Sequence, residues 1–135
     1  MTVQRSVAVR NARLDVIETT IGTAAKVQIR TGAQPTNCAA AAAGTLLAEF
    51  ALASDWAAAA SAGAKAFSNV PVAATAVAAG TAAHYRIVDT AGTTCGEQGT
   101  VTATGGGGDV TIDNAVIANG QAVNLTGWTV TEPGA

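Results

Sequence analysis

The sequence has few charged side chains and few groups suited to catalysis. Asp, Glu, Lys and Arg make up 12% of the 135 residues, and there is one histidine, whereas a charged share of about 25% is usual. No basic stripe is present, which argues against nucleic acid as a partner. A weakly charged surface loses water easily when another protein covers it, which favours a subunit of a homo-oligomer or larger assembly. An isolated monomer with a threonine-rich surface is the alternative.

Long apolar runs are also missing. The alanine tracts at residues 39–43 and 57–60 are far shorter than the roughly 20 residues of a membrane span. Residues 1–22 carry polar side chains at short intervals in place of the apolar core of a signal peptide. We therefore expect no membrane partner, no leader peptide and synthesis in a cytoplasm.

Alternating apolar residues predict a mainly β protein. In the segment 82–104, Tyr85 and Ile87 alternate with His84 and Arg86, as in a strand with one buried face. We expect His84 and Arg86 to face solvent. Aromatic residues make up only 4% of the chain, so the scarce large side chains are expected to anchor the core, with a loop delivering Trp56 and the last strand Trp128.

Further strands are expected along the rest of the chain, with a β-bulge at Gly127 in the last one. Four glycines at 105–108 are read as a flexible hairpin tip. A phosphate-binding loop is disfavoured there, because the Lys-Ser/Thr pair is missing and a strand follows. About seven or eight short strands predict an antiparallel β-sandwich or jelly-roll-like domain. They are expected at residues 26–30, 45–53, 64–67, 74–77, 84–89, 93–104, 109–113 and 121–131.

One amphipathic helix is predicted before the strands, over residues 2–21, ending at Gly22. Its apolar stripe is expected to leave Asp15 and Glu18 facing outward. Arg10 interrupts the stripe, either as a solvated side chain or as half of a salt bridge to another subunit. The chain is thus divided into an N-terminal helix, residues 1–22, and a β-sandwich domain, residues 23–135. The candidate interface is Val3, Val7, Arg10, Leu14 and Ile17.

The residues suited to chemistry do not form a recognisable site. His84 has no nucleophile motif beside it. Asp109 and Asp113 bracket a strand, but two carboxylates fall short of the roughly six to eight oxygens of a calcium site. A zinc site from Cys38, Cys95 and His84 lacks a fourth ligand. We therefore expect no enzyme activity, no metal and no cofactor.

Cys38 and Cys95 are the two cysteines of the chain, and both lie in loop-like contexts. Free buried cysteines are usually found in apolar cores, so this placement favours one disulfide. A reducing cytoplasm disfavours such a bond. An assembly that later leaves the cell would escape that objection.

Several segments together resemble a family of small structural proteins of tailed bacteriophages. They are VRNARLDVIETTIGT, IRTGAQPTNCAAAAAGTLLA, SDW, TAAHYRIVDTAGTTC, GTVTATGGGGD and IANGQAV. The shared motifs are helix, turn and strand signatures, and none of them marks an active site. The resemblance implies a phage origin and a place in the virion.

The composition and the resemblance together predict a non-enzymatic virion protein. We expect a head decoration (cement) protein that stabilises the capsid through subunit contacts with the major capsid protein. The alternative is a tail, neck or fibre subunit that contacts tail proteins. Such a subunit could itself be a receptor- or glycan-binding module. In each case the protein is assembled in the host cytoplasm and ends up in the virion.

Overall fold

The protein is mainly β with one N-terminal helix, as predicted, in a computed structural model that describes residues 3–134. Met1, Thr2 and Ala135, which belong to the predicted segments 1–22 and 23–135, lie outside the described residues. In chain order the elements are α1 (Val7–Ile21), β1 (Lys26–Arg30), β2 (Leu46–Ala51), β3 (Ala64–Ala66), β4 (Val72–Thr75), β5 (Gly80–Thr81), β6 (His84–Val88), β7 (Cys95–Ala103), β8 (Val110–Ile112), β9 (Val116–Ile117) and β10 (Ala122–Thr131).

The helix begins later than the sequence pattern predicts, at Val7. Ser6 has an extended backbone, and its hydroxyl accepts a hydrogen bond from the backbone N–H of Val9 at 3.2 Å. This is the geometry of an N-cap, which satisfies one of the free N–H groups of the first turn. Residues 3–6 precede the helix and have no regular secondary structure, and we call them the N-terminal arm.

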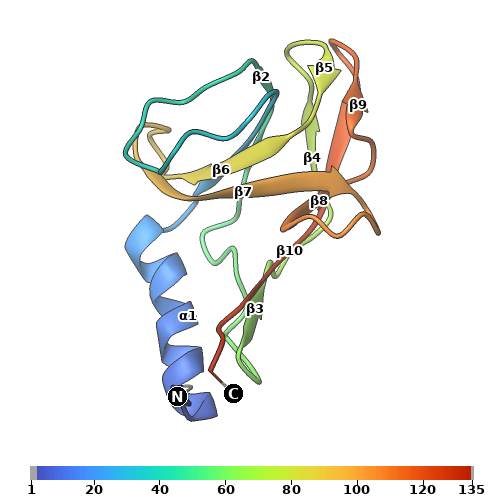
Figure 1. Ribbon diagram of the computed structural model, residues 1–135. Coiled ribbons are helices and arrows are strands. Elements are labelled where there is room, and N and C mark those ends of the chain that lie inside the picture. Colours follow the sequence, from blue (N-terminus) through green and yellow to red (C-terminus); the bar gives the residue numbers. More distant parts are fainter. Residues whose placement is uncertain (1–2, 135) are drawn as a thin grey trace.

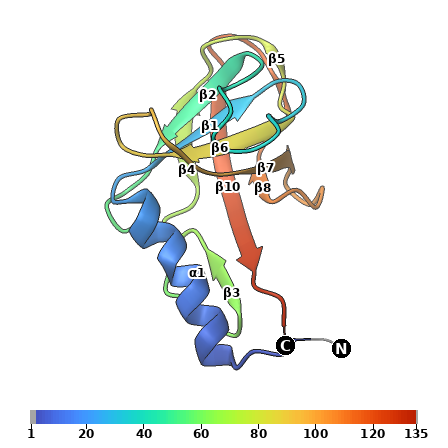
Figure 2. The same ribbon diagram turned by 60° about the vertical axis from the view of Figure 1, so that its left-hand side comes forward.

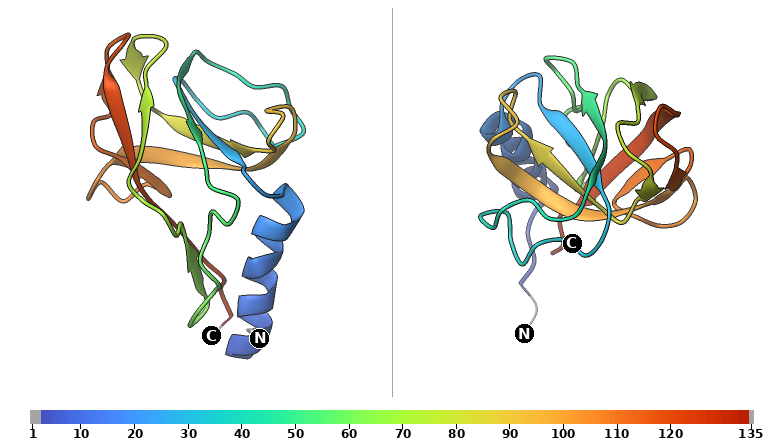
Figure 3. Two further views of the ribbon diagram at one scale, coloured as in Figure 1. Left: turned by 180° about the vertical axis from the view of Figure 1, so that it is seen from behind. Right: turned by 90° about the horizontal axis from the view of Figure 1, so that it is seen from above.

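Eight strands form one curled sheet, in the order β2-β1-β6-β7-β8-β10-β3, with β4 also paired to β10. The curl brings β4 round to β2, where the backbone N–H of Val77 donates to the carbonyl oxygen of Leu47 at 2.8 Å. The strands β5 and β9 form a separate pair at the end of the molecule opposite α1 (Figures 1 and 3). The sheet thus wraps around a core as a sandwich does.

The pairing of β7 with β8 differs from the expected hairpin, because the two strands are parallel. The chain turns back over Thr102, whose hydroxyl accepts a hydrogen bond from the N–H of Gly108 at 2.9 Å. A Cβ atom on Gly106 or Gly108 would lie 2.8 Å from atoms of Thr102. These glycines therefore permit a close approach of the loop to its own strand.

Three aromatic rings fill the core where the helix meets the sheet. Trp56, Phe67 and Trp128 have ring centroids 4.9–6.0 Å apart, and all three side chains are buried. The indole N–H of Trp56 donates to the carbonyl oxygen of Gly22 at 2.9 Å, directly after the helix. The predicted role of Trp56 and Trp128 as core anchors is confirmed, as is the register shift near Gly127 in β10.

The second face of β6 is buried, contrary to the prediction that it meets solvent. His84 and Arg86 are 1% and 5% exposed, because the loop of residues 31–45 lies over them. His84 Nδ1 bonds to the carbonyl oxygen of Gly32, and Arg86 Nη2 donates to that of Ala40, each at 2.8 Å. We call this loop the strap. Its backbone carbonyls accept hydrogen bonds from His84 and Arg86, in place of the water molecules that would accept them at an exposed surface.

Candidate interaction surface

The orientation of α1 is set by one buried cation on β3. Lys65 is 3% exposed, and its ammonium donates to Asp15 Oδ1 at 2.8 Å and to the carbonyl oxygen of Ala58 at 2.9 Å. Glu18 Oε2 lies 3.5 Å from the same nitrogen. The prediction that Asp15 and Glu18 face outward is therefore corrected. Both carboxylates reach Lys65, because a buried ammonium must be paired with acids, while the Asp15 side chain stays 46% exposed and that of Glu18 20%. The helix is turned so that these acids face the sheet.

The same rotation buries two members of the candidate interface. Leu14 is 1% exposed and Arg10 is 9% exposed. The Arg10 guanidinium packs against Gly63, where a Cβ atom would collide with its Nη1, and Asn11 Oδ1 accepts the N–H of Gly63 at 2.9 Å. Arg10 is thus not solvated, and Arg10 and Leu14 face the interior of their own chain. Both are removed from the candidate interface.

The opposite side of the helix presents valines to solvent. Val3 and Val7, from the candidate interface, are 63% and 48% exposed, and Val9 and Val16 are exposed to a similar degree. Val7 is exposed at the first turn of the helix, on the side of Leu14, whereas Val9, Ala12 and Val16 share the opposite side. We call Val9, Ala12 and Val16 the outer face of α1. Exposed apolar side chains gathered on one helix face are typical of a surface that another protein covers.

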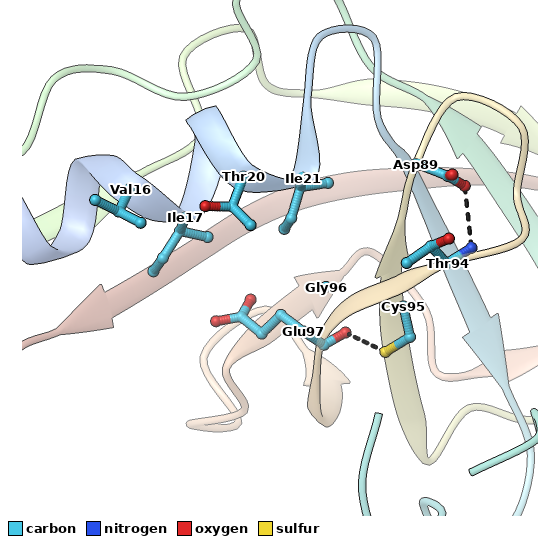
Figure 4. A pocket seen from close by; sticks show the side chains of 9 residues that line it. All are labelled: Val16, Ile17, Thr20, Ile21, Asp89, Thr94, Cys95, Gly96 and Glu97. Carbon is cyan, nitrogen blue, oxygen red and sulfur yellow. Dashed lines mark hydrogen bonds between the residues drawn. The ribbon is translucent and has the colours of Figure 1, made fainter. Parts of the chain in front are cut away.

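A groove lies beside the outer face, between the last turns of α1 and the start of β7 (Figure 4). It has a volume of about 440 Å³. Ile17, the remaining member of the candidate interface, is half-buried in its wall, and Val16 belongs to both the outer face and the groove. The surface is therefore continuous from the helix into the groove. The lining residues are Val16, Ile17, Thr20, Ile21, Asp89, Thr94, Cys95, Gly96 and Glu97.

The charged groups that line this groove, Asp89 and Glu97, are both acidic. Asp89 Oδ1 accepts the N–H groups of Thr93 and Thr94 at 2.9 and 3.1 Å, and these bonds lower the pKa of its carboxyl. Asp89 is therefore ionised at neutral pH. It gives one end of the groove a fixed negative charge.

Glu97 is the more deeply placed acid. Its Oε2 accepts hydrogen bonds from the Tyr85 hydroxyl at 3.0 Å and from the Trp128 indole N–H at 2.8 Å. Burial raises the pKa of Glu97 above its ordinary value of 4.5, and the two hydrogen bonds act in the opposite direction. Within residues 3–134, Oε1 accepts no hydrogen bond. Glu97 thus carries an acceptor that a donor entering the groove could use.

The two cysteines meet at the edge of this groove. Cys38 on the strap and Cys95 at the start of β7 form a disulfide that spans 57 positions of sequence. The Gln98 side-chain N–H donates to the carbonyl oxygen of Pro35 at 2.7 Å, which holds the strap against the same strand. The disulfide therefore fastens the strap to the strand that forms one wall of the groove.

The other residues weighed for chemistry form no common site. Asp113 accepts hydrogen bonds from the backbone and side chain of Asn124, and Asp109 accepts from Thr100. Asp109 and Glu97 also line a second hollow of about 450 Å³, together with Tyr85 and residues of β10. No group of three or more metal-binding side chains occurs in the described part of the chain.

Comparison with models of protein families, with curated proteins and with solved structures finds no match. In residues 3–134 no helix has the length and apolar character needed to cross a membrane.

Glu97 was not singled out from the sequence. A signal was present, because Gly96 and Gly99 interrupt a strand, and glycine inside a strand often marks a close approach of another segment. A Cβ atom at Gly96 would collide with the side chain of Ile21. At Gly99 it would lie 2.9 Å from the Tyr85 ring. The two glycines therefore mark where the helix and Tyr85 come close to β7.

Proposed function

We propose that the protein is a non-enzymatic structural subunit of a bacteriophage virion, and specifically a head decoration protein. The observation that carries this proposal is the outer face of α1, whose exposed valines continue into an apolar groove. The charged share of 12% supports it, since a surface with few ions loses little hydration on contact. The resemblance to phage structural proteins supplies the virion context.

The core anchors favour a structural role over recognition of glycans. Sugar-binding sites commonly place aromatic rings on the surface, whereas Trp56, Phe67 and Trp128 are at most 7% exposed. Tyr85 is also buried and donates its hydroxyl to Glu97. A tail, neck or fibre subunit would use the same outer face against a different neighbour.

The test is incorporation of a Val16→Asp variant into particles made by a phage whose own copy of the gene is deleted. A carboxylate at this half-exposed position is tolerated in the free chain but is desolvated in an interface. We expect the variant to fold and to be lost from purified particles, as measured by quantitative mass spectrometry. A cryo-EM map of wild-type particles is expected to place the protein on the outside of the head.

The matched control is Val116→Asp on β9, at the end of the molecule opposite α1 (Figure 1). Val116 is 68% exposed, against 57% for Val16, so the two substitutions are comparable in the free chain. Normal incorporation of Val16→Asp would remove the outer face from the interface. Absence of the wild-type protein from particles would overturn the proposed function.

A further inference from the structure

The groove beside α1 is acidic, and the positive charges of the chain are nearly all committed elsewhere. Lys26, Lys65 and Arg13 pair with carboxylates. Arg30 and Arg86 donate to glutamine side chains, and Arg10 is buried against Gly63. Within residues 3–134, Arg5 is the cation that is neither buried, nor paired with a carboxylate, nor hydrogen-bonded through its side chain.

Arg5 lies in the N-terminal arm, between two exposed valines. Val3 and Val7 are 63% and 48% exposed, and the arm has no regular secondary structure. The arm is attached to its own chain through Arg5. The backbone N–H of Arg5 donates to the carbonyl oxygen of Gly134, and its guanidinium lies against Gly134, where a Cβ atom would be 3.1 Å from Nη1. Figure 2 shows the two ends of the chain close together, so the arm must leave this contact to dock elsewhere. The arm offers an apolar, cationic, apolar pattern. This pattern complements a groove that has apolar walls and two acids.

An arm cannot reach the groove of its own chain. The groove begins at Val16, and the helix rises about 1.5 Å per residue, so some 15 Å of helix separates Arg5 from its nearest edge. The arm lies in front of Val7 and the groove beside the last turns of α1. An arm that fills the groove must come from another copy.

We propose that the N-terminal arm of one copy docks in the α1–β7 groove of a second copy. Val3 packs against Ile17 and Ile21, and the Arg5 guanidinium donates to Glu97 and Asp89. The raised pKa of Glu97 fits this arrangement, because a bound cation would stabilise its carboxylate. The partner named by this inference is a second copy of the chain. The inference rests on the proposed function only in taking the virion as the place where the copies meet.

Arm and groove are different surfaces. A reciprocal exchange of arms would give a two-fold dimer, whereas the contact proposed here is head-to-tail, with the arm of each copy in the groove of the next. Such a contact closes into a ring or continues as a chain, in contrast to a symmetric dimer. One short arm buries less than the roughly 1,200 Å² of a stable interface. Each contact is therefore weak, and the affinity that holds a ring together comes from several such contacts formed at once.

The direct test uses a fluorescent peptide of residues 1–8, MTVQRSVA, titrated with the full-length protein. We expect saturable binding that weakens by about tenfold or more for the Arg5→Glu peptide, because a cation–carboxylate contact is lost and reversed. A Thr20→Arg variant of the protein places a bulky cation in the groove wall and should abolish binding. Its neighbour Thr19 is exposed and does not line the groove, so Thr19→Arg is the matched control and should bind normally.

A mixing experiment tests the head-to-tail geometry. Full-length Arg5→Glu keeps its groove, and full-length Thr20→Arg keeps its arm. Each variant alone should sediment as a monomer at concentrations where the wild type associates, whereas an equimolar mixture should form one-to-one dimers that grow no further. Equal binding of the two peptides, or unchanged association of both variants, would overturn the inference.

The inference and the proposed function fail in different ways. If the peptide does not bind but Val16→Asp still abolishes incorporation into particles, the outer face contacts another virion protein and the arm–groove contact is wrong. If the peptide binds in the groove but the protein is absent from particles, the arm–groove contact holds and the virion role is wrong.

Discussion

Glu97 shows how one side chain can serve both the core and the surface. One of its carboxylate oxygens accepts the hydroxyl of Tyr85 and the indole N–H of Trp128, while its side chain also lines the groove. Burial and the nearby Glu97 charge raise the pKa of Tyr85, so its hydroxyl remains a donor at neutral pH. The core therefore holds Glu97 in a fixed position at the surface.

The raised pKa of Glu97 makes stability depend on pH. A carboxyl with a higher pKa in the folded than in the unfolded state contributes stability below its ordinary value of 4.5, and that contribution is lost as the pH rises through the folded pKa. We expect Glu97→Gln to gain free energy of unfolding relative to the wild type as the pH rises between about 4 and 8. Urea unfolding across that range measures it.

The control for this prediction is Gln98→Ala, the next residue along β7. It removes a hydrogen bond to the strap without removing a titrating group, so its difference from the wild type should stay constant with pH. A constant difference for Glu97→Gln as well would show that the carboxylate is not destabilised by burial.

Among the elements, α1 is attached to the sheet more firmly than its sequence predicts. Lys65 is enclosed by Asp15 and Glu18 from the helix and by the carbonyl oxygen of Ala58. Removal of the whole helix would leave this ammonium buried without an acid and would also remove Leu14, Ile17 and Ile21, which are buried or packed against the core. Point substitutions therefore test the helix surface better than a deletion.

Asp15→Asn tests the attachment of α1. A hydrogen bond to a charged group contributes about 1.5–3 kcal/mol, but the Asp15 side chain is 46% exposed and solvent screens the pair. We therefore expect a loss of about 1 kcal/mol in the free energy of unfolding at neutral pH. The Lys65 hydrogen bond lowers the pKa of Asp15 from 3.8, so in the wild type this contribution should disappear as the pH falls below that value. Asp55→Asn, on an exposed loop, is the control and should leave stability unchanged.

The strands were largely predictable from the sequence, whereas the side of α1 that faces the sheet was not. The strands follow local alternation of apolar residues and turn signals, which act within a few positions. The rotation of α1 depends on Lys65, some fifty residues later. Similarly, His84 and Arg86 point away from the core as predicted but are covered by a strap whose path no local pattern encodes.

The candidate surface was predictable in part. Val3 and Val7 are exposed and Ile17 lines the groove, but Val9 and Val16 replace Arg10 and Leu14 on the outer face. The groove itself depends on the last turns of α1 and on residues 89–97, which lie about seventy positions later in the chain. Contacts of this kind arise from packing, and apolar periodicity along the sequence does not reveal them.

At the scale of the whole molecule, the exposed apolar side chains gather at two ends. The arm and the outer face of α1 lie at one end, and Val77 and Val116 lie toward the other, near β5 and β9 (Figures 1 and 3). In the proposed assembly the α1 end makes both contacts, because the arm meets a second copy and the outer face of α1 meets the particle. The end that carries Val116 makes neither contact, which is why Val116→Asp serves as the control.

The meeting of Arg5 and Gly134 at one end of the molecule has a mechanical consequence. Tension applied to the two ends of the chain loads this contact and the outer end of β10 first, so hydrogen bonds break one after another, as in a zipper. The disulfide then keeps the segment between Cys38 and Cys95 from being stretched. This segment spans 57 positions, and each position would add up to about 3.6 Å to the extended chain. In optical-tweezers experiments we expect the oxidised chain to stretch to a contour roughly 200 Å shorter than the reduced chain. Equal contour lengths would mean that Cys38 and Cys95 are not joined.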